Sequence, residues 1–284
     1  MAHPVFSQPV SSPPSADSRV LTAHDLLKTL AIVLMVVDHL GYYFFPENEW
    51  FRVFGRMCVP IWFFLIGYAN ARRVQPDIWL GAGVLVVSNV LAGEYLLPLN
   101  ILFTLAAARI WMDTVMARAL RSHEAMAGVF LIMLFLALPS LAFFEYGTLG
   151  MLFAMFGYLR RHRESITLNP WALAGFAAGS VILYVFVQAL LMESLTAAQF
   201  WTMLAGVSGV CVLLFLFRPH LFPVFSRRAR IATLSLQWIG HHTLSIYVVH
   251  LLVFKLLAMV LSPERFSFLH FGLMPTGLAG LFLP

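Results

Sequence analysis

The residues best suited to chemistry are an adjacent acid and imidazole, Asp38 and His39, about fifteen residues into a long apolar segment. Lys28 lies about three helical turns before His39 and shares its helix face, whereas Asp38 points roughly 100° away. We therefore expect His39 to face a cavity and Asp38 to fix a neighbouring helix, with Arg56 or His250 as its partner. An imidazole that titrates near neutral pH can act as a general base. The alternative is a histidine that only hydrogen-bonds between helices.

Further polar residues are expected at a similar depth, in apolar segments or at their ends. Tyr247 and His250 lie at i and i+3 of the last long segment, on one helix face. Their neighbours in the predicted polar centre are Arg56, Glu94, Asn100, Glu145 and Tyr146. Each has a simpler interpretation, since an arginine or glutamate can snorkel and a tyrosine can be an ordinary aromatic contact. We expect Lys255 to point away from His250 and snorkel outward, and His241 and His242 to be interfacial.

The elements that position these residues must lie in a membrane. Of the 284 residues, 61% are hydrophobic and only 11% are charged, whereas about a quarter of a soluble domain is charged. The sequence predicts an all-α, polytopic transmembrane bundle with about nine spans, each of roughly 20 apolar residues. We place them near residues 24–45, 56–71, 77–93, 96–115, 125–142, 144–160, 170–192, 199–217 and 233–260.

The basic residues predict an orientation. Twelve of the eighteen lysines and arginines fall in the second, fourth, sixth and eighth connections, in pairs or clusters such as Arg72 and Arg73 or Arg160 and Arg161. The positive-inside rule places these connections and the N-terminus in the cytoplasm, which implies a multi-pass protein of the inner membrane. The net charge of +5 is therefore interpreted as membrane topology and not as a nucleic-acid site.

The chain ends are expected to differ from the bundle. Residues 1–22 are rich in Pro, Ser and Ala and are predicted to be a disordered tail without a signal peptide. Residues 23–262 would form the transmembrane domain. Residues 263–284 are apolar but contain Pro275, and are expected to form a tail, a partial span or a tenth crossing. No metal-site motif is found, and no metal is predicted.

Several motifs resemble those of the TraX family, which is named for the F-pilin N-acetyltransferase. The run from Asp25 to His39 resembles the opening span of that family. Gly55-Arg56 and the following Val59-Pro60 resemble its Gly-Arg-x-x-Phe-Pro motif, with Val59 where Phe is usual. The segments Asn100–Leu105, Glu145–Gly150 and Leu244–Leu251 fit in the expected order, the last being shared with other membrane acyltransferases such as the heparan-glucosaminide N-acetyltransferase group.

The resemblance implies transfer of an acyl group, usually acetyl, from cytoplasmic acyl-CoA, with His39 as the catalytic residue. Asp38, Arg56, Tyr247 and His250 would complete the catalytic group, Arg56 or Tyr247 stabilising the oxyanion. Lys28, Asn100, Glu145 and Tyr146 would contact the substrate. Acetyl-CoA is the expected co-substrate, and its phosphates need positive charge, which Arg72, Arg73, Arg160 and Arg161 would supply.

The acceptor and the class of protein leave alternatives open. A pilin N-terminus and a cell-envelope glycan both fit an acceptor amine or hydroxyl at or beyond the membrane, within a lipid environment. A proton-coupled small-molecule transporter is the rival class, because intramembrane Asp, Glu and His also form proton relays. The missing internal repeat argues against it. An assembly partner without chemistry is a third possibility.

Overall fold

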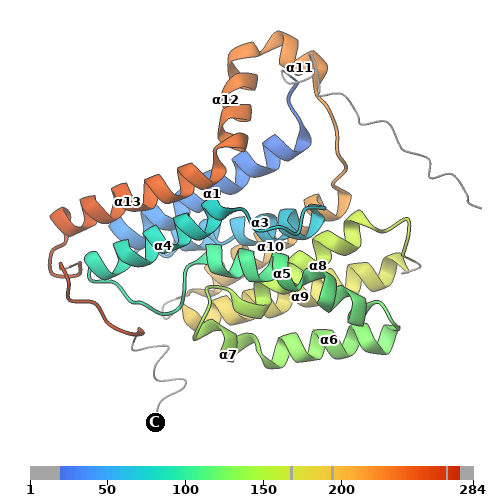
Figure 1. Ribbon diagram of the computed structural model, residues 1–284, viewed down its shortest axis with the longest axis horizontal. Coiled ribbons are helices and arrows are strands. Elements are labelled where there is room, and N and C mark those ends of the chain that lie inside the picture. The colour runs from blue at the N-terminus through green and yellow to red at the C-terminus, as the bar shows by residue number, and fades with distance from the viewer. Residues whose placement is uncertain (1–19, 167–168, 193–194, 267, 276–284) are drawn as a thin grey trace, which may run out of the picture.

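The computed structural model describes residues 20–166, 169–192, 195–266 and 268–275. Within these ranges the protein is all-helical, with only isolated backbone bridges in place of strands (Figure 1). The helices are α1 Ala23–Phe44, α2 Trp50–Gly55, α3 Cys58–Tyr68, α4 Pro76–Leu91, α5 Ile101–Ala119, α6 His123–Phe135, α7 Ala137–Leu141, α8 Gly147–Arg161, α9 Pro170–Leu191, α10 Ala197–Leu216, α11 Pro223–Arg228, α12 Arg230–His241 and α13 Thr243–Leu261.

Five helical segments among the described residues are long and apolar enough to cross a bilayer, judged by length and composition. They are α1, α2 with α3 taken as one segment (Trp50–Tyr68), α9, α10 and α13. Two shorter apolar helices, α4 and α6, do not reach that length. The protein is therefore a helical membrane protein. The count of about nine spans and the orientation of the N-terminus stay predictions.

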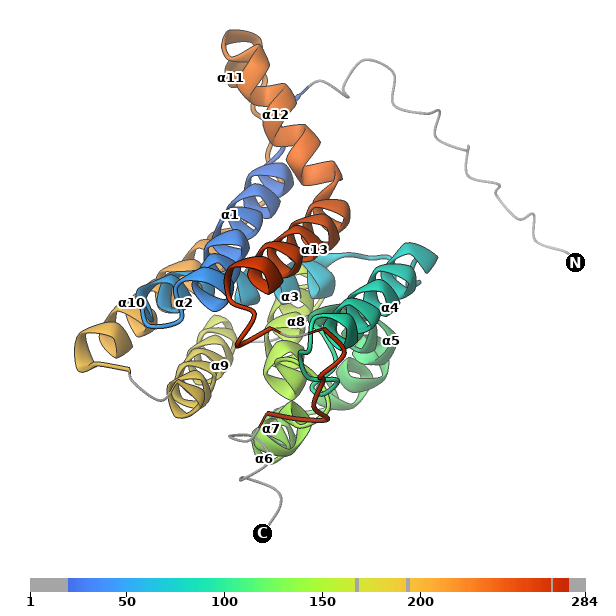
Figure 2. The same ribbon diagram turned by 90° about the vertical axis from the view of Figure 1, so that its left-hand side faces the viewer.

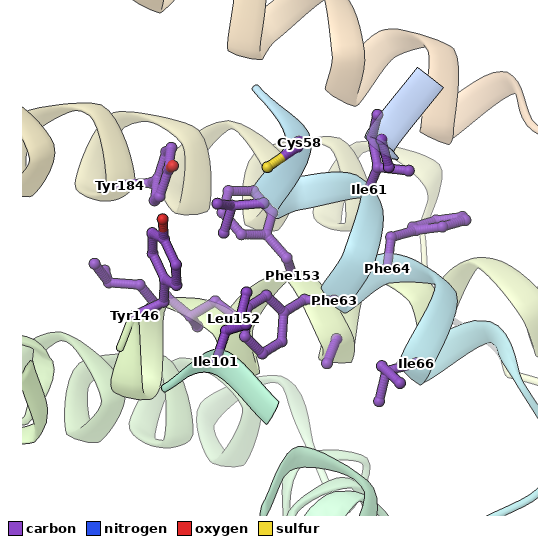
Figure 3. Packing of buried hydrophobic residues seen from close by; sticks show 14 of the residues in the cluster. Cys58, Ile61, Phe63, Phe64, Ile66, Ile101, Tyr146, Leu152, Phe153 and Tyr184 are labelled. Atoms are coloured by element: carbon purple, nitrogen blue, oxygen red, sulfur yellow. The ribbon is translucent and has the colours of Figure 1, made fainter. Parts of the chain in front are cut away.

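The centre of the bundle is the contact between α3 and α8, which lie beside each other in both views (Figures 1 and 2). The two backbones touch because each helix places a glycine against the backbone of the other: a Cβ on Gly67 would lie 1.7 Å from the Ala154 carbonyl oxygen. A Cβ on Gly157 would lie 2.1 Å from the Phe64 carbonyl oxygen. Small residues at such crossings allow close helix packing in membranes. Figure 3 shows the aromatic side chains, Phe63 and Phe153 among them, that fill the core beside this contact.

The predicted last span, residues 233–260, is wrong at its start. The chain breaks at His242, and α12 leaves the bundle at an angle to α13 (Figure 1). The half of α12 that faces α1 is polar or small, with Thr233, Gln237 and Gly240 buried. Lys28 donates to the Gly240 carbonyl at 3.1 Å. The last long apolar helix therefore begins at Thr243, and α12 packs beside the start of α1.

Both described chain ends lie against other elements. Residues 1–19 lie outside the described residues, but Leu21 is buried and its N–H donates to Ser226 Oγ of α11. At the other end, the non-helical segment 268–275 crosses the α4–α5 connection, where Leu96 and Leu97 donate backbone hydrogen bonds to Gly272 and Leu273. We call residues 268–275 the C-terminal strap. The C-terminal strap contains no helix, and residues 276–284 lie outside the described chain.

Candidate active site

His39 of α1 and His250 of α13 form the centre of the site. The Nδ1 of His39 lies 2.8 Å from the Nε2 of His250, and the two rings are tilted with centroids 5.0 Å apart. Tyr247, one helical turn before His250, places its ring 6.0 Å from that of His39. The predicted catalytic residues from the first and last long helices are thus brought together.

The hydrogen bonds define the tautomers of the two neutral rings. His250 Nδ1 lies 2.7 Å from the carbonyl oxygen of Ile246, and a carbonyl only accepts, so this nitrogen carries the proton. His250 Nε2 is then an acceptor, and His39 Nδ1–H donates to it. The remaining nitrogen, His39 Nε2, keeps its lone pair. The second histidine therefore leaves the first with one basic nitrogen in a fixed ring orientation.

Asp38 pairs with two arginines of the next segment. Its Oδ2 lies 3.1 Å from Arg52 and its Oδ1 lies 3.6 Å from the Nε of Arg56. The expected contact with Arg56 is confirmed, whereas Arg52 was missed. Gly55 makes this approach possible, because a Cβ there would lie 2.4 Å from the Cα of Asp38. The two residues of the Gly-Arg pair therefore act together. Gly55 allows α1 to pack closely at Asp38, and Arg56 neutralises the charge of the Asp38 carboxylate.

Arg56 is also held on its other side. Its guanidinium donates to the Tyr146 hydroxyl and lies over the Tyr146 ring. Pro60 has no N–H to donate to the Arg56 carbonyl four residues earlier. The Tyr184 hydroxyl donates to that carbonyl at 2.9 Å instead. Figure 3 shows Tyr146 with its hydroxyl directed toward Tyr184, and the two ring centroids lie 6.4 Å apart. Sequence reasoning missed Tyr184, which lies in an otherwise ordinary apolar helix.

Asn100 and Glu145 both accept hydrogen bonds from backbone N–H groups at the start of α5. The Asn100 side chain accepts from the N–H of Leu102 and donates to the Ala82 carbonyl. Glu145 Oε2 accepts from the N–H of Ile101 at 2.9 Å. A carboxylate at a helix N-terminus is stabilised by the free N–H groups and the helix dipole. Both side chains lie at the site, where Asn100 lines one cavity and Glu145 lines two.

Lys255 forms a buried ion pair, so the expectation that it snorkels outward was wrong. Its Nζ lies 3.0 Å from Glu94 Oε2, and the two side chains are 5% and 8% exposed. Tyr43 donates to the other oxygen of Glu94 at 3.0 Å, and Lys255 also donates to Ser88 and Asn89. The partners of Lys255 come from α4 and the residues after it. The helical periodicity of α13, from which the orientation of Lys255 was predicted, contains no information about them.

Two cavities meet at this centre. A cavity of about 500 Å³, the large cavity, contains Lys28 at one end and His39 at the other. A second cavity of about 180 Å³, the small cavity, contains the Glu94–Lys255 pair and Pro275 of the C-terminal strap. Five residues line both cavities: Asp38, His39, Glu145, Tyr146 and Tyr247. His39 is therefore reachable from two sides.

The far end of the large cavity is basic. The cationic and imidazole residues there come from four helices: His24, Lys28, Arg109, Arg161 and His241. The only acidic residues among its described lining, Asp38 and Glu145, lie at the His39 end. Arg109 Nε is buried with no hydrogen-bond partner among the described residues. About 16 Å of helix separates Lys28 from His39, and the walls between are apolar, with Trp62 and Leu105 among them.

The four arginines expected to bind a CoA ester do not share one site. Arg161 lines the large cavity and donates to the Tyr68 carbonyl. Arg160, its neighbour on α8, points elsewhere and donates to the Phe215 carbonyl at 2.6 Å. Arg72 pairs with Asp113 at 2.9 Å, and Arg73 is exposed. Arg109 and His24 were not expected and are found only from the cavity they line.

Comparisons with known proteins agree with the motifs. A family model described as TraX protein matches residues 23–258. An uncharacterised protein of Rickettsia prowazekii, RP591, is 23% identical over 243 residues, which cover 81% of this chain and 90% of that protein. Protein TraX of Escherichia coli is 35% identical over 100 residues, 32% of this chain and 40% of that protein. No solved structure shows significant similarity. The family match spans every residue of the His39 centre, and the chain belongs to the TraX protein family.

Proposed function

We propose that this protein is a membrane-bound acyltransferase that moves an acetyl group from acetyl-CoA to an acceptor amine or hydroxyl. The observation that carries the proposal is that both cavities are lined by His39, whose Nδ1 is bonded to His250 and whose Nε2 keeps its lone pair. One cavity would deliver the donor and the other the acceptor. The resemblance to the F-pilin N-acetyltransferase family supports the same reaction.

The large cavity suits a CoA thioester. Its basic end, with Arg109 and Arg161, offers charge-assisted hydrogen bonds to phosphates. The unpartnered Nε of Arg109 gains a partner when an anion binds. The apolar walls would hold the pantetheine arm, which brings the thioester to His39. Its volume of about 500 Å³ falls within the range of ligand pockets.

The orientation proposed for the chain fits this direction of transfer. With about nine spans and a cytoplasmic N-terminus, the arginine-rich connections and the basic end of the large cavity face the cytoplasm, where acyl-CoA is made. The small cavity would then open toward the other side of the inner membrane. An acetyl group would cross part of the bilayer between the two cavities, with the CoA moiety left on the cytoplasmic side.

His39 Nε2 would take the proton from the acceptor while the nitrogen or oxygen of the acceptor forms a bond to the thioester carbonyl carbon. The carbon–sulfur bond then breaks, and the proton passes to the departing CoA sulfur. An acyl-histidine route would use the same nitrogen as the nucleophile. The Tyr247 hydroxyl forms no hydrogen bond among the described residues, and Tyr247 lines both cavities. We therefore favour it over Arg56, already paired with Asp38 and Tyr146, as the oxyanion donor.

The acceptor would present a small reactive end. A volume of about 180 Å³ admits the terminus of a chain and not a folded protein or a whole polymer. A pilin N-terminal residue and a single sugar of an envelope glycan both satisfy this limit. Glu145 Oε2 accepts a hydrogen bond from the Ile101 N–H, which leaves Oε1 to accept a hydrogen bond from an N–H or O–H group of the acceptor substrate.

The proposal is tested by CoA binding to the detergent-solubilised protein, followed by acetyl-CoA turnover with candidate acceptors. A ligand that prefers the native state must raise the unfolding midpoint. We expect CoA to raise it, with the effect reduced in Arg161→Gln. Release of free CoA should then require both acetyl-CoA and an acceptor. A protein that ignores CoA while moving protons would be a transporter and not an acyltransferase.

A further inference from the structure

A second apolar site lies away from the His39 centre, between α6 and α9. Both helices pack on α8 (Figure 2), and α6 itself contributes no buried residue. They leave an open groove of about 460 Å³. The groove is lined by Met126, Phe130 and Leu131 of α6 and by Leu173, Gly175 and Phe176 of α9. The groove shares no lining residue with the two cavities described above.

On the α9 side, Gly175 keeps the groove open because it has no side chain to fill it. A Cβ built on Gly175 meets no atom within 4 Å, so this helix position presents only backbone to the groove. On the other side, Phe130 closes the floor by an edge contact with Phe176, whose centroid lies 5.6 Å away. An apolar chain can therefore lie along α9 in contact with the glycine.

A basic pocket of about 300 Å³ continues from one end of the groove. Leu159 and Leu173 line both spaces. The pocket contains Arg160 and Arg163, and neither forms an ion pair within the described part of the chain. Arg160 is 6% exposed. Its Nε donates to the Phe215 carbonyl, and four of its five N–H donors are left for a ligand.

We propose that the groove and the pocket together bind one anionic phospholipid. The phosphate lies against Arg160 and Arg163, and an acyl chain extends along the groove past Gly175. Basic pockets between membrane helices bind acidic lipid headgroups on the side that carries the Lys and Arg excess. A soluble anion would not use the apolar groove, and a neutral lipid would not use two unpaired arginines. This site is independent of acyl transfer.

The test uses purified protein stripped of lipid in a neutral detergent, with the unfolding midpoint as readout. We add phosphatidylglycerol, or phosphatidylcholine with the same acyl chains, or soluble glycerol phosphate. Phosphatidylglycerol should raise the midpoint by about 2–4 °C more than phosphatidylcholine does. Glycerol phosphate should give no comparable shift. Equal shifts with the two lipids, or a full shift with glycerol phosphate, overturn the proposal.

Two variants separate the headgroup from the chain. Arg163→Gln removes an exposed cation, and Gly175→Leu fills the groove, and each should abolish the preference for phosphatidylglycerol. The matched controls are Arg121→Gln, in another basic connection, and Gly209→Leu of α10, where a Cβ also meets nothing within 4 Å. Both controls should keep the preference. If Gly175→Leu keeps it too, the lipid chain does not lie in the groove and the proposal is wrong.

Discussion

His39 and His250 are separated by 211 positions in the sequence, yet their ring nitrogens lie 2.8 Å apart. The second ring is itself oriented by the Ile246 carbonyl. In this series of two hydrogen bonds, His250 donates to the Ile246 carbonyl and His39 donates to His250. The Nε2 of His39 is then the nitrogen left with a lone pair. The arrangement resembles a base held by an orienting partner, a relationship that recurs in unrelated enzymes.

His250 is expected to act through His39. Replacing His250 by Phe removes the acceptor for His39 Nδ1–H, so the His39 ring loses its fixed tautomer. CoA release should fall by about 10²–10⁴-fold, the range of general-base effects. His250→Gln, whose amide oxygen can accept the same hydrogen bond, should retain more activity than the Phe variant. Equal losses in both variants, with unchanged unfolding midpoints, would argue against orientation by hydrogen bonding.

Gly55 should tolerate no side chain. In Gly55→Ala the new Cβ collides with the Asp38 backbone, and overpacking of this kind costs about 1–3 kcal/mol or more. The unfolding midpoint should fall, and activity should fall with it because the Asp38–Arg56 contact is displaced. Gly128→Ala in α6 is the control, since a Cβ there meets nothing within 4 Å. That variant should leave the midpoint unchanged or higher.

The sequence predicted the helical class and singled out Asp38, His39 and the Gly55-Arg56 pair because those signals are local. An acid–imidazole pair inside an apolar segment is costly to insert, which makes it a candidate for function, and the Gly-Arg pair adds to that signal by its order and spacing. The divergence of Arg160 and Arg161 was not predictable, because cavity positions depend on which helices pack beside α8. The break at His242 was hidden for a similar reason: α12 has exposed apolar residues such as Ile231 and Trp238, so it reads as a continuation of α13.

The Glu94–Lys255 pair gives a stability prediction. Lys255→Met would leave the Glu94 carboxylate buried beside Tyr43 without its cation, which costs about 3–5 kcal/mol when one partner of a buried pair is removed. The double variant Glu94→Gln with Lys255→Met should recover much of that loss. A double-mutant cycle on unfolding midpoints measures the coupling. A midpoint unchanged in Lys255→Met would indicate a lysine that faces solvent or lipid headgroups.

Donor binding should depend on the large cavity and not on positive charge in general. Arg109→Gln and Arg161→Gln each remove a cation from the basic end, and each should weaken CoA binding by about tenfold, the value of one charge-assisted hydrogen bond. Arg73→Gln removes an exposed arginine outside the cavity and is the control. Binding measured by titration calorimetry should be unaffected in that control. Equal weakening in all three variants would point to a diffuse electrostatic effect.

Acyl transfer at His39 is tested most directly by acetyl-CoA consumption in the presence of an acceptor preparation, with purified wild-type protein compared with His39→Ala. We expect consumption to fall to the uncatalysed rate, while CoA still raises the unfolding midpoint of the variant because the basic end of the large cavity is intact. Undiminished consumption in His39→Ala would mean that His39 is not the catalytic residue.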